Sequence, residues 1–253
     1  MLVNMILLRG ATQLDLTGPY EVLARLPGAR IELVAESLEP VATDKGLAIV
    51  PTTTREAAEQ ADLLVVPGGP GVDEAILDSG WVAFTAEQGR AARWVFGVCT
   101  GSLLLGAAGL LKGRRAGGHW QARALLAEFG ATVSHARMTV DGNTFTSGGV
   151  TAGIDMALKV VAEIAGEEAA RRLQLQIEYD PEPPFRSGTP FTASRETVEA
   201  TLAATAAHRE ARGAAVREAA ARLKGGAQNV PEPGDLYGIA RGANPDGYRD
   251  GHE

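Results

Sequence analysis

A single cysteine, Cys99, stands where a short apolar run gives way to a helix. The run Trp94–Val98 contains β-branched and aromatic residues and predicts a buried strand, and residues 102–105 predict the start of a helix. Gly97 and Gly101 flank the break, so the chain can turn sharply and hold the cysteine in a strained conformation. Strand, sharp turn and helix form a nucleophile elbow. The pattern therefore favours a nucleophilic Cys99 over the small buried hydrophobe that a lone cysteine usually is.

The predicted position of Cys99 also bears on its ionisation. Thr100 or Ser102 can cap the helix that follows. The unpaired N–H groups and the positive end of the helix dipole both favour a thiolate at a helix N-terminus. We therefore expect Cys99 to be acidic and to react with iodoacetamide well below the ordinary thiol pKa of about 8.5.

A glycine-rich loop follows another predicted strand. Residues 62–66 predict a buried parallel strand, and the loop PGGPG occupies residues 67–71. No Lys-Ser/Thr pair follows, so a phosphate-binding loop is a weak interpretation. An oxyanion hole beside Cys99 is a better one, because open α/β sheets bind ligands at the carboxyl ends of their strands. Gly68 and Gly69 are the candidate residues, and Gly69 can donate an N–H group where Pro70 cannot.

Asp15 lies among apolar neighbours after the first predicted strand, residues 3–8. We place it on the connection to a short helix that begins at Pro19, a favourable first helical residue, and runs to Leu26. One interpretation is a turn or cap residue, which is the commoner role of aspartate. The other is a poorly solvated carboxyl with a raised pKa and a proton to exchange. The spacing alone does not distinguish the two.

The histidines are weaker candidates for catalytic or metal-binding residues. We interpret His119 as a helix-start or core histidine, with a Cys99–His119 dyad as the alternative, because residues far apart in sequence can meet in the fold. The spacing of His135, His208 and His252 does not suggest a metal site. We therefore expect no metal.

Composition narrows the classes of protein and partner. The chain has 253 residues, 45% hydrophobic and 22% charged, which is typical of a globular protein with a full core. The net charge of −7 and the lack of a dense Lys/Arg cluster argue against nucleic acid as a partner. One cysteine fits a reducing compartment, and neither a signal peptide nor a membrane-length apolar run is evident, so we expect a cytoplasmic protein.

Strands and helices alternate along the chain, which predicts an α/β fold with a mainly parallel sheet. The loop after the first strand, the glycine-rich loop and the elbow should then meet at one edge of the sheet. We expect a single domain over residues 1–224 and an irregular Gly/Pro-rich tail over 225–253. Residues 194–224 predict an alanine-rich helix or helix pair that packs on the surface. The remaining elements are expected as strands at 31–35, 41–50 (a pair), 132–134, 138–141 and 144–146, as a helical turn or two at 54–60, and as helices at 81–90, 103–111, 121–129, 150–165 and 167–176.

Five stretches carry a family resemblance. They read QLDLTGP at 13–19, VVPGGPG at 65–71, VCTGSLLLGAAGLLKGRRA at 98–116, GGVTAGIDMAL at 148–158 and LQIEYDPEPPF at 175–185. Together they resemble the ThiJ/PfpI superfamily and, within it, the isonitrile hydratases, over residues 1–224. VCTGS occurs in many members, including sensor domains, whereas the combination of DLTGP, CTGS and EYDPEPPF is more specific.

This resemblance implies a flavodoxin-like sandwich and a homodimer without metal or cofactor. It implies that Cys99 is the nucleophile, Asp15 the acid/base carboxyl and Thr100 a supporting residue. The implied reaction is hydration of a small-molecule isonitrile to an N-substituted formamide. Protease-like members carry histidine directly after the cysteine, so Thr100 argues against peptidase activity.

The sequence departs from the usual family pattern at two places. Residues 9–12 form a shorter and less apolar loop than is usual in the family, and Gly117 and Gly118 replace hydroxyl residues before His119, so the pocket should have a different shape.

Glyoxalase or deglycase chemistry on 2-oxoaldehydes would use the same nucleophile and carboxyl. A non-catalytic redox or ligand sensor would use a reactive Cys99. A DNA-binding sensor is disfavoured, because no recognition-helix pattern follows position 200.

Overall fold

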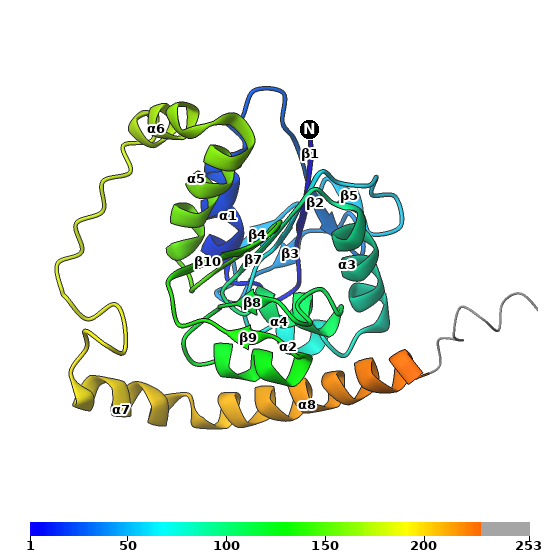
Figure 1. The fold of residues 1–253 in the computed structure, drawn as a ribbon, viewed down its shortest axis with the longest axis vertical. Helices are drawn as coiled ribbons and strands as arrows, with labels where there is room; N and C mark the ends of the chain where they lie inside the picture. The colour runs from blue at the N-terminus through cyan, green and yellow to red at the C-terminus, as the bar shows by residue number, and fades with distance from the viewer. Residues whose placement is uncertain (229–253) are drawn as a thin grey trace, which may run out of the picture.

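The computed structural model describes residues 1–228, so the expected tail lies outside the described residues from position 229 onward. A seven-stranded sheet in the order β10-β11-β7-β6-β1-β2-β5 forms the centre of the molecule (Figure 1). All neighbouring strands are parallel except β10 and β11. The strands of this sheet are β1 (Leu2–Ile6), β2 (Arg30–Ala35), β5 (Thr53–Thr54), β6 (Leu63–Val66), β7 (Trp94–Val98), β10 (Met138–Asp141) and β11 (Thr144–Ser147).

The central strands β1, β6 and β7 are parallel and deeply buried. Every residue of β1 and β6 is buried, as expected for strands covered on both faces. Two pairs of short strands lie outside the sheet, β3 (Val41–Ala42) with β4 (Ala48–Ile49) and β8 (Arg115–Ala116) with β9 (Thr132–Val133). The predicted α/β fold with a mainly parallel sheet is therefore confirmed.

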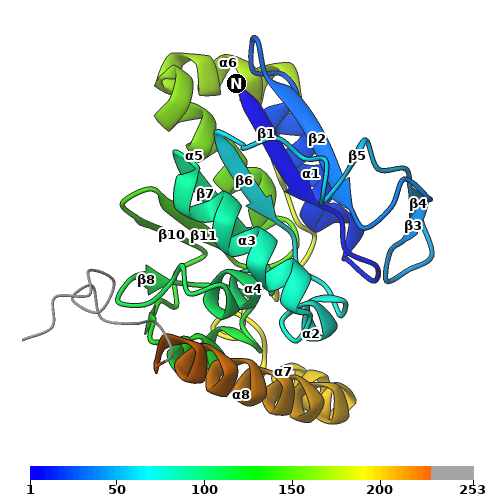
Figure 2. The ribbon, with the colours of Figure 1, turned by 90° about the vertical axis from the view of Figure 1, so that its right-hand side faces the viewer.

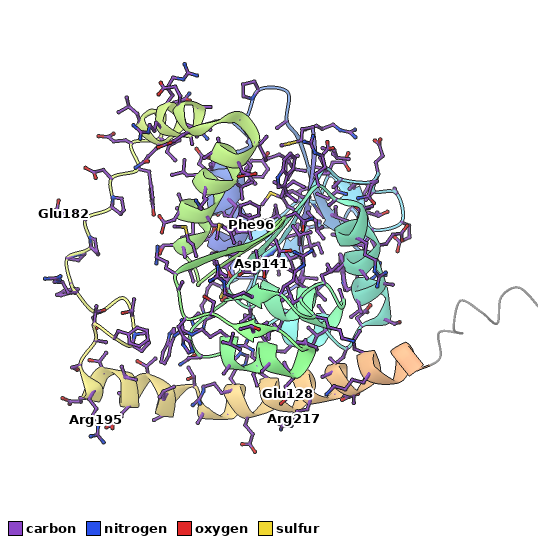
Figure 3. The ribbon with its side chains drawn as sticks, viewed as in Figure 1. Phe96, Glu128, Asp141, Glu182, Arg195 and Arg217 are labelled. Carbon is purple, nitrogen blue, oxygen red and sulfur yellow. The ribbon has the colours of Figure 1, made fainter. Side chains whose placement is uncertain are left out.

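Helices cover both faces of the sheet and enclose two hydrophobic clusters. One cluster joins β1, β6 and β7 to α1 (Gln13–Leu23), α5 (Ala152–Ala165) and α6 (Glu167–Gln176). The other lies on the opposite face, where α2 (Val72–Ala75), α3 (Ser79–Ala91), α4 (Gly101–Ala107), the 3-10 helix η1 (Arg123–Phe129) and α8 (Ala206–Gln228) pack (Figure 2). Phe96 on β7 is fully buried and lies at the centre of the molecule (Figure 3).

The first helix begins earlier than expected. Helix α1 starts at Gln13 after Thr12, so Pro19 lies inside it and not at its first position. An interior proline removes one helix hydrogen bond. Here the ring packs against α5, where Gly153 leaves it room, since a side chain at that position would lie 3.1 Å from the Pro19 ring. Close packing of the two helices thus outweighs the local preference of proline.

Other expected boundaries also shift. A turn follows β5 at residues 55–57, where a helical turn or two was expected over 54–60. Helix α4 ends at Ala107 instead of continuing to Leu111. The helix expected over 121–129 is a 3-10 helix that ends at Gly130 in the left-handed conformation. Helix α8 passes through Gly225 and Gly226 to Gln228, so the expected domain boundary at 224 falls inside a helix.

A long connection carries the chain from α6 around the domain to α7 (Arg195–Ala204) and α8 (Figure 1). Glu182 lies on the outer side of this connection and Arg195 at the start of α7 (Figure 3). Helix α8 packs through the buried residues Val216, Ala219 and Ala220, in agreement with the expected packing arm. Among the described residues, no helix combines the length and the apolar character needed to cross a membrane.

Candidate active site

Cys99 occupies the predicted elbow. Its φ of 59° lies in the left-handed region, which costs free energy for a residue with a side chain. The flanking glycines are required by close packing, since a Cβ at Gly101 would lie 2.0 Å from the carbonyl oxygen of Val66 and one at Gly97 would lie 2.8 Å from the Leu105 side chain. Close packing on both sides of the strand–helix junction therefore requires glycine at positions 97 and 101.

Backbone and side-chain hydrogen bonds fix the cysteine in this conformation. The Cys99 amide donates to the carbonyl oxygen of Ser147 on β11 at 3.1 Å. Its own carbonyl oxygen accepts from the Ser102 hydroxyl at 3.0 Å and from the His119 amide at 3.2 Å. Three separate segments thus hold the backbone of the elbow, and Cys99 is 6% exposed.

Asp15 is on helix α1, and not on the connection where we expected it. Its side chain is fully buried, and Oδ2 accepts a hydrogen bond from the Gly68 amide at 3.2 Å. The cap interpretation is wrong, because no side chain caps this helix N-terminus. Asp15 instead lies beside Cys99, close enough for each group to shift the pKa of the other. A Cβ at Gly68 would approach Asp15 Oδ2 to 2.7 Å and Cys99 Cβ to 2.8 Å, so the contact depends on glycine there.

The buried position changes the ionisation of Asp15. Desolvation raises the pKa of its carboxyl from 3.8 to about 7, against the lowering effect of the hydrogen bonds from Cys99 and Gly68. The negative charge of Asp44 contributes in the same direction as burial. Oδ1 has no hydrogen-bond partner among the described residues. The carboxyl therefore exchanges its proton near neutral pH, which is the second of the two interpretations from sequence.

The expected acidity of Cys99 is wrong in direction. Burial raises the pKa of the thiol well above its ordinary value, and the charge and hydrogen bond of Asp15 raise it further. The Thr100 amide and the charge of Arg212 lower the pKa, but by less. The helix terminus is thus a minor influence beside desolvation, and the resting site does not hold a preformed thiolate.

The expected oxyanion donors are already engaged by protein groups. The Gly69 amide donates to Thr100 Oγ1 at 2.9 Å, and the Thr100 hydroxyl donates to the Gly69 carbonyl at 3.2 Å. The Gly68 amide is bound to Asp15. These glycines therefore position Asp15 and Thr100, in contrast to the oxyanion role that we expected. Thr100 joins the glycine-rich loop to the elbow, which agrees with a supporting role.

His119 lies next to the Cys99 thiol, although the two residues are far apart in sequence. A Cβ at Gly149 would lie 2.7 Å from His119 Cδ2 and 2.9 Å from Cys99 Sγ, so imidazole and thiol are neighbours across this glycine. Burial and the charges of Arg212 and Arg123 lower the pKa of His119 to about 4. At neutral pH the ring is uncharged, which argues against a thiolate–imidazolium dyad.

A cavity of about 310 Å³ lies beside His119 and Gly149. His119, Gly148 and Gly149 line it on the side of Cys99. Gly188, Thr189, Pro190 and Phe191 from the long connection before α7 also line it. The cavity is therefore separated from Cys99 by His119 and Gly149, which contact both. Within residues 1–228, no three His, Cys, Asp or Glu side chains are grouped so as to hold a metal ion.

Arg212 on α8 is a residue that the sequence did not single out. It is 5% exposed, and its Nε donates to Asp73 Oδ1 at 2.7 Å. Its Nη2 lies 2.7 Å from His208 Nε2. Because its charge lowers the pKa of both Cys99 and His119, the helix arm adds a cation to the electrostatics of the site. An arginine in an Ala-rich helix gives no signal of this in sequence.

Residues 1–163 match the DJ-1/PfpI family. The chain is 45% identical to the isonitrile hydratase of Pseudomonas putida over 221 residues, which cover 87% of this chain and 97% of that protein. A solved ThiJ/PfpI family protein from Pseudomonas syringae is 42% identical, with a TM-score of 0.83 over 85% of this chain and 90% of that one. An HTH-type transcriptional regulator of Pseudomonas aeruginosa is 34% identical over 137 residues, but these cover only 37% of its length.

Proposed function

Because this chain belongs to the DJ-1/PfpI family and resembles an isonitrile hydratase along almost its whole described length, we propose that it hydrates isonitriles to N-substituted formamides. The observation that carries the proposal is the contact between the buried Asp15 carboxyl and the Cys99 thiol on the strained elbow. A nucleophile and a proton carrier in contact are the two groups that this hydration needs.

In the proposed first step, the Asp15 carboxylate accepts the thiol proton while Cys99 Sγ forms a bond to the terminal carbon of the isonitrile. Asp15 then gives the proton to the same carbon, and the product is the thioimidate R–N=CH–S–Cys99. A pKa of about 7 suits this role, because the carboxyl both accepts and releases protons near neutral pH. The Thr100 amide, which lowers the pKa of the thiol, stabilises charge that develops on the sulfur during attack.

In the second step, water adds to the carbon of the thioimidate. Asp15 takes a proton from this water and passes it to the nitrogen, which gives R–NH–CH(OH)–S–Cys99. Cleavage of the C–S bond then releases the formamide R–NH–CHO, and the hydroxyl proton returns through Asp15 to the thiol. The cycle needs no external oxidant or reductant, and every proton moves among the Cys99 thiol, Asp15, water and the substrate.

Turnover assays test the proposal directly. The purified protein is incubated with cyclohexyl isocyanide, and formation of N-cyclohexylformamide is followed by NMR. A parallel assay with methylglyoxal measures the rival glyoxalase or deglycase chemistry. We expect catalytic hydration of the isonitrile and little consumption of methylglyoxal. The reverse ranking would replace the proposed function by the rival one.

We also propose that the protein works as a homodimer, on the basis of the family resemblance. Light scattering at micromolar concentration measures the mass directly, and we expect twice the chain mass of 26.4 kDa. A monomer under these conditions contradicts this part of the proposal and leaves the chemistry of the site unaffected.

A further inference from the structure

Among the described residues, basic side chains line the cavity beside Cys99 and acidic ones do not. Its charged residues are Arg123 and Arg137, and His119 and His135 also reach it. Such one-sided charge favours anionic ligands in a partly enclosed site. The two arginines differ in how far their charge is already neutralised.

Arg137 is neutralised by protein groups. Its Nε donates to Asp155 Oδ2 at 2.5 Å, and its Nη2 donates to the Thr151 hydroxyl at 3.2 Å. The same carboxylate accepts a hydrogen bond from the Tyr179 hydroxyl at 2.6 Å. Arg137 therefore belongs to a closed network that holds the long connection against α5.

Arg123 differs from Arg137 in having no acidic partner among the described residues. Its Nη1 donates to the carbonyl oxygen of His135 at 2.9 Å, which fixes the side chain without cancelling its charge. Desolvation lowers the pKa of the guanidinium, as expected for a partly buried cation without a counter-charge. Arg123 is thus a fixed, uncompensated charge at the cavity wall.

The cavity also lies near the nucleophile. His119 and Gly149 line the cavity and also pack against Cys99, so one layer of residues separates the cavity from the sulfur. Trp120, Val150, Pro190 and Phe191 add apolar and aromatic side chains to its lining. A ligand that fits has an apolar body with an anionic group remote from its reacting carbon.

We infer that the substrate is an isonitrile that carries a carboxylate, and that Arg123 binds this carboxylate in the cavity beside Cys99. The planar guanidinium matches a carboxylate through paired N–H donors. This inference rests on the proposed function and adds the substrate class to it. It makes Arg123 a residue that selects the substrate and takes no part in proton transfer.

The test compares two isonitriles of nearly equal shape, 4-isocyanobenzoate and 4-isocyanobenzamide. In the wild-type protein we expect kcat/KM to be about tenfold or more higher for the carboxylate, which is the effect of a hydrogen bond to a charged group. Arg123→Met should lower kcat/KM for the carboxylate by about the same factor and leave the amide within about twofold. A melting curve shows that the variant is folded.

Arg115 provides the matched control. It is an exposed arginine outside the cavity, and its guanidinium donates to a backbone carbonyl, that of Val140 at 3.5 Å. Arg115→Met should change neither substrate. Equal rates for the two isonitriles in the wild type, or an equal loss for both in Arg123→Met, would overturn the inference.

Direct binding separates failure of this inference from failure of the proposed function. If neither isonitrile is hydrated, the proposed function is wrong, and calorimetry with 4-formamidobenzoate then tests the subsite without turnover. Binding about tenfold weaker in Arg123→Met than in the wild type supports the carboxylate subsite. Equal binding in the two proteins refutes it, whatever reaction the protein catalyses.

Discussion

The reaction centre and the cavity wall are built in opposite ways. At the centre, Asp15, Gly68, Gly69 and Thr100 are bound to one another or to the elbow, and Cys99 is held by three segments. At the wall, Arg123 keeps its charge uncompensated, and Phe191 is 76% exposed. A closed centre fixes the geometry of proton transfer, whereas an open wall has contacts left for a ligand. We therefore propose that the first region carries out the chemistry and that the second selects the substrate.

Removal of the nucleophile should have the largest effect. Cys99→Ala should abolish turnover, because no other thiol exists in the chain, while the fold is retained. Product formation by NMR and a melting curve measure the two effects. Substantial turnover in the folded variant would rule out covalent catalysis at this position.

Removal of the proton carrier should have the next largest effect. Asp15→Asn keeps the shape of the side chain and removes its titration, so turnover should fall about a hundredfold or more. In the wild type, kcat/KM should rise as the pH passes through about 7, where Asp15 becomes a carboxylate, and this rise should be absent in the variant. Near-normal turnover in Asp15→Asn would refute the proposed mechanism even if Cys99 is essential.

The same variant changes the pH dependence of stability. Because the pKa of Asp15 is raised from 3.8 to about 7 in the folded protein, the folded state holds a proton that the unfolded state has lost between these values. The free energy of unfolding should therefore fall as the pH rises from about 4 through 7, by up to about 4 kcal/mol from this group. Denaturant unfolding at a series of pH values should show this fall in the wild type and a weaker one in Asp15→Asn.

A substitution at the boundary of the two regions should have an intermediate effect. Gly149→Ala places a Cβ 2.9 Å from Cys99 Sγ and 2.7 Å from His119, so it obstructs access from the cavity to the sulfur. We expect kcat/KM to fall about tenfold or more, because small displacements of the reacting atoms are costly. Gly148→Ala is the control, since its Cβ would have no neighbour closer than 3.7 Å. Equal effects of the two substitutions would show that Gly149 does not lie between the cavity and the sulfur.

The smallest effect is expected from the helix arm. The charge of Arg212 lowers the pKa of Cys99, so Arg212→Met should move the midpoint of Cys99 alkylation to higher pH. Arg222→Met is the matched control, because Arg222 lies on the same helix in an exposed ion pair with Glu218. Alkylation by iodoacetamide across pH, followed by mass spectrometry, measures both. An unchanged midpoint in Arg212→Met would remove this helix from the electrostatics of the site.

Predictions from local sequence patterns were correct where the structure depends on residues that are close in sequence. The elbow was predictable because Gly97 and Gly101 are needed for close contacts at a strand–helix junction. The hairpin around Gly142 and the strand pair around Gly46 were predictable because each needs a glycine of positive φ. The start of α1 was not, because packing of Pro19 against Gly153 acts across more than a hundred residues.

The sequence by itself determined the α/β architecture, the strained position of Cys99 and the meeting of three loops at one edge of the sheet. These follow from steric limits on the backbone and from the pattern of apolar residues, which are local properties. Only the tertiary structure decided that Asp15 turns toward Cys99, that the loop glycines bind protein oxygens and that Arg123 lacks an acidic partner among the described residues. Ionisation and hydrogen bonding at a buried group depend on which distant segments exclude water from it. Desolvation, which no local pattern reports, therefore reversed the expected acidity of Cys99 and placed the titration of Asp15 near neutral pH.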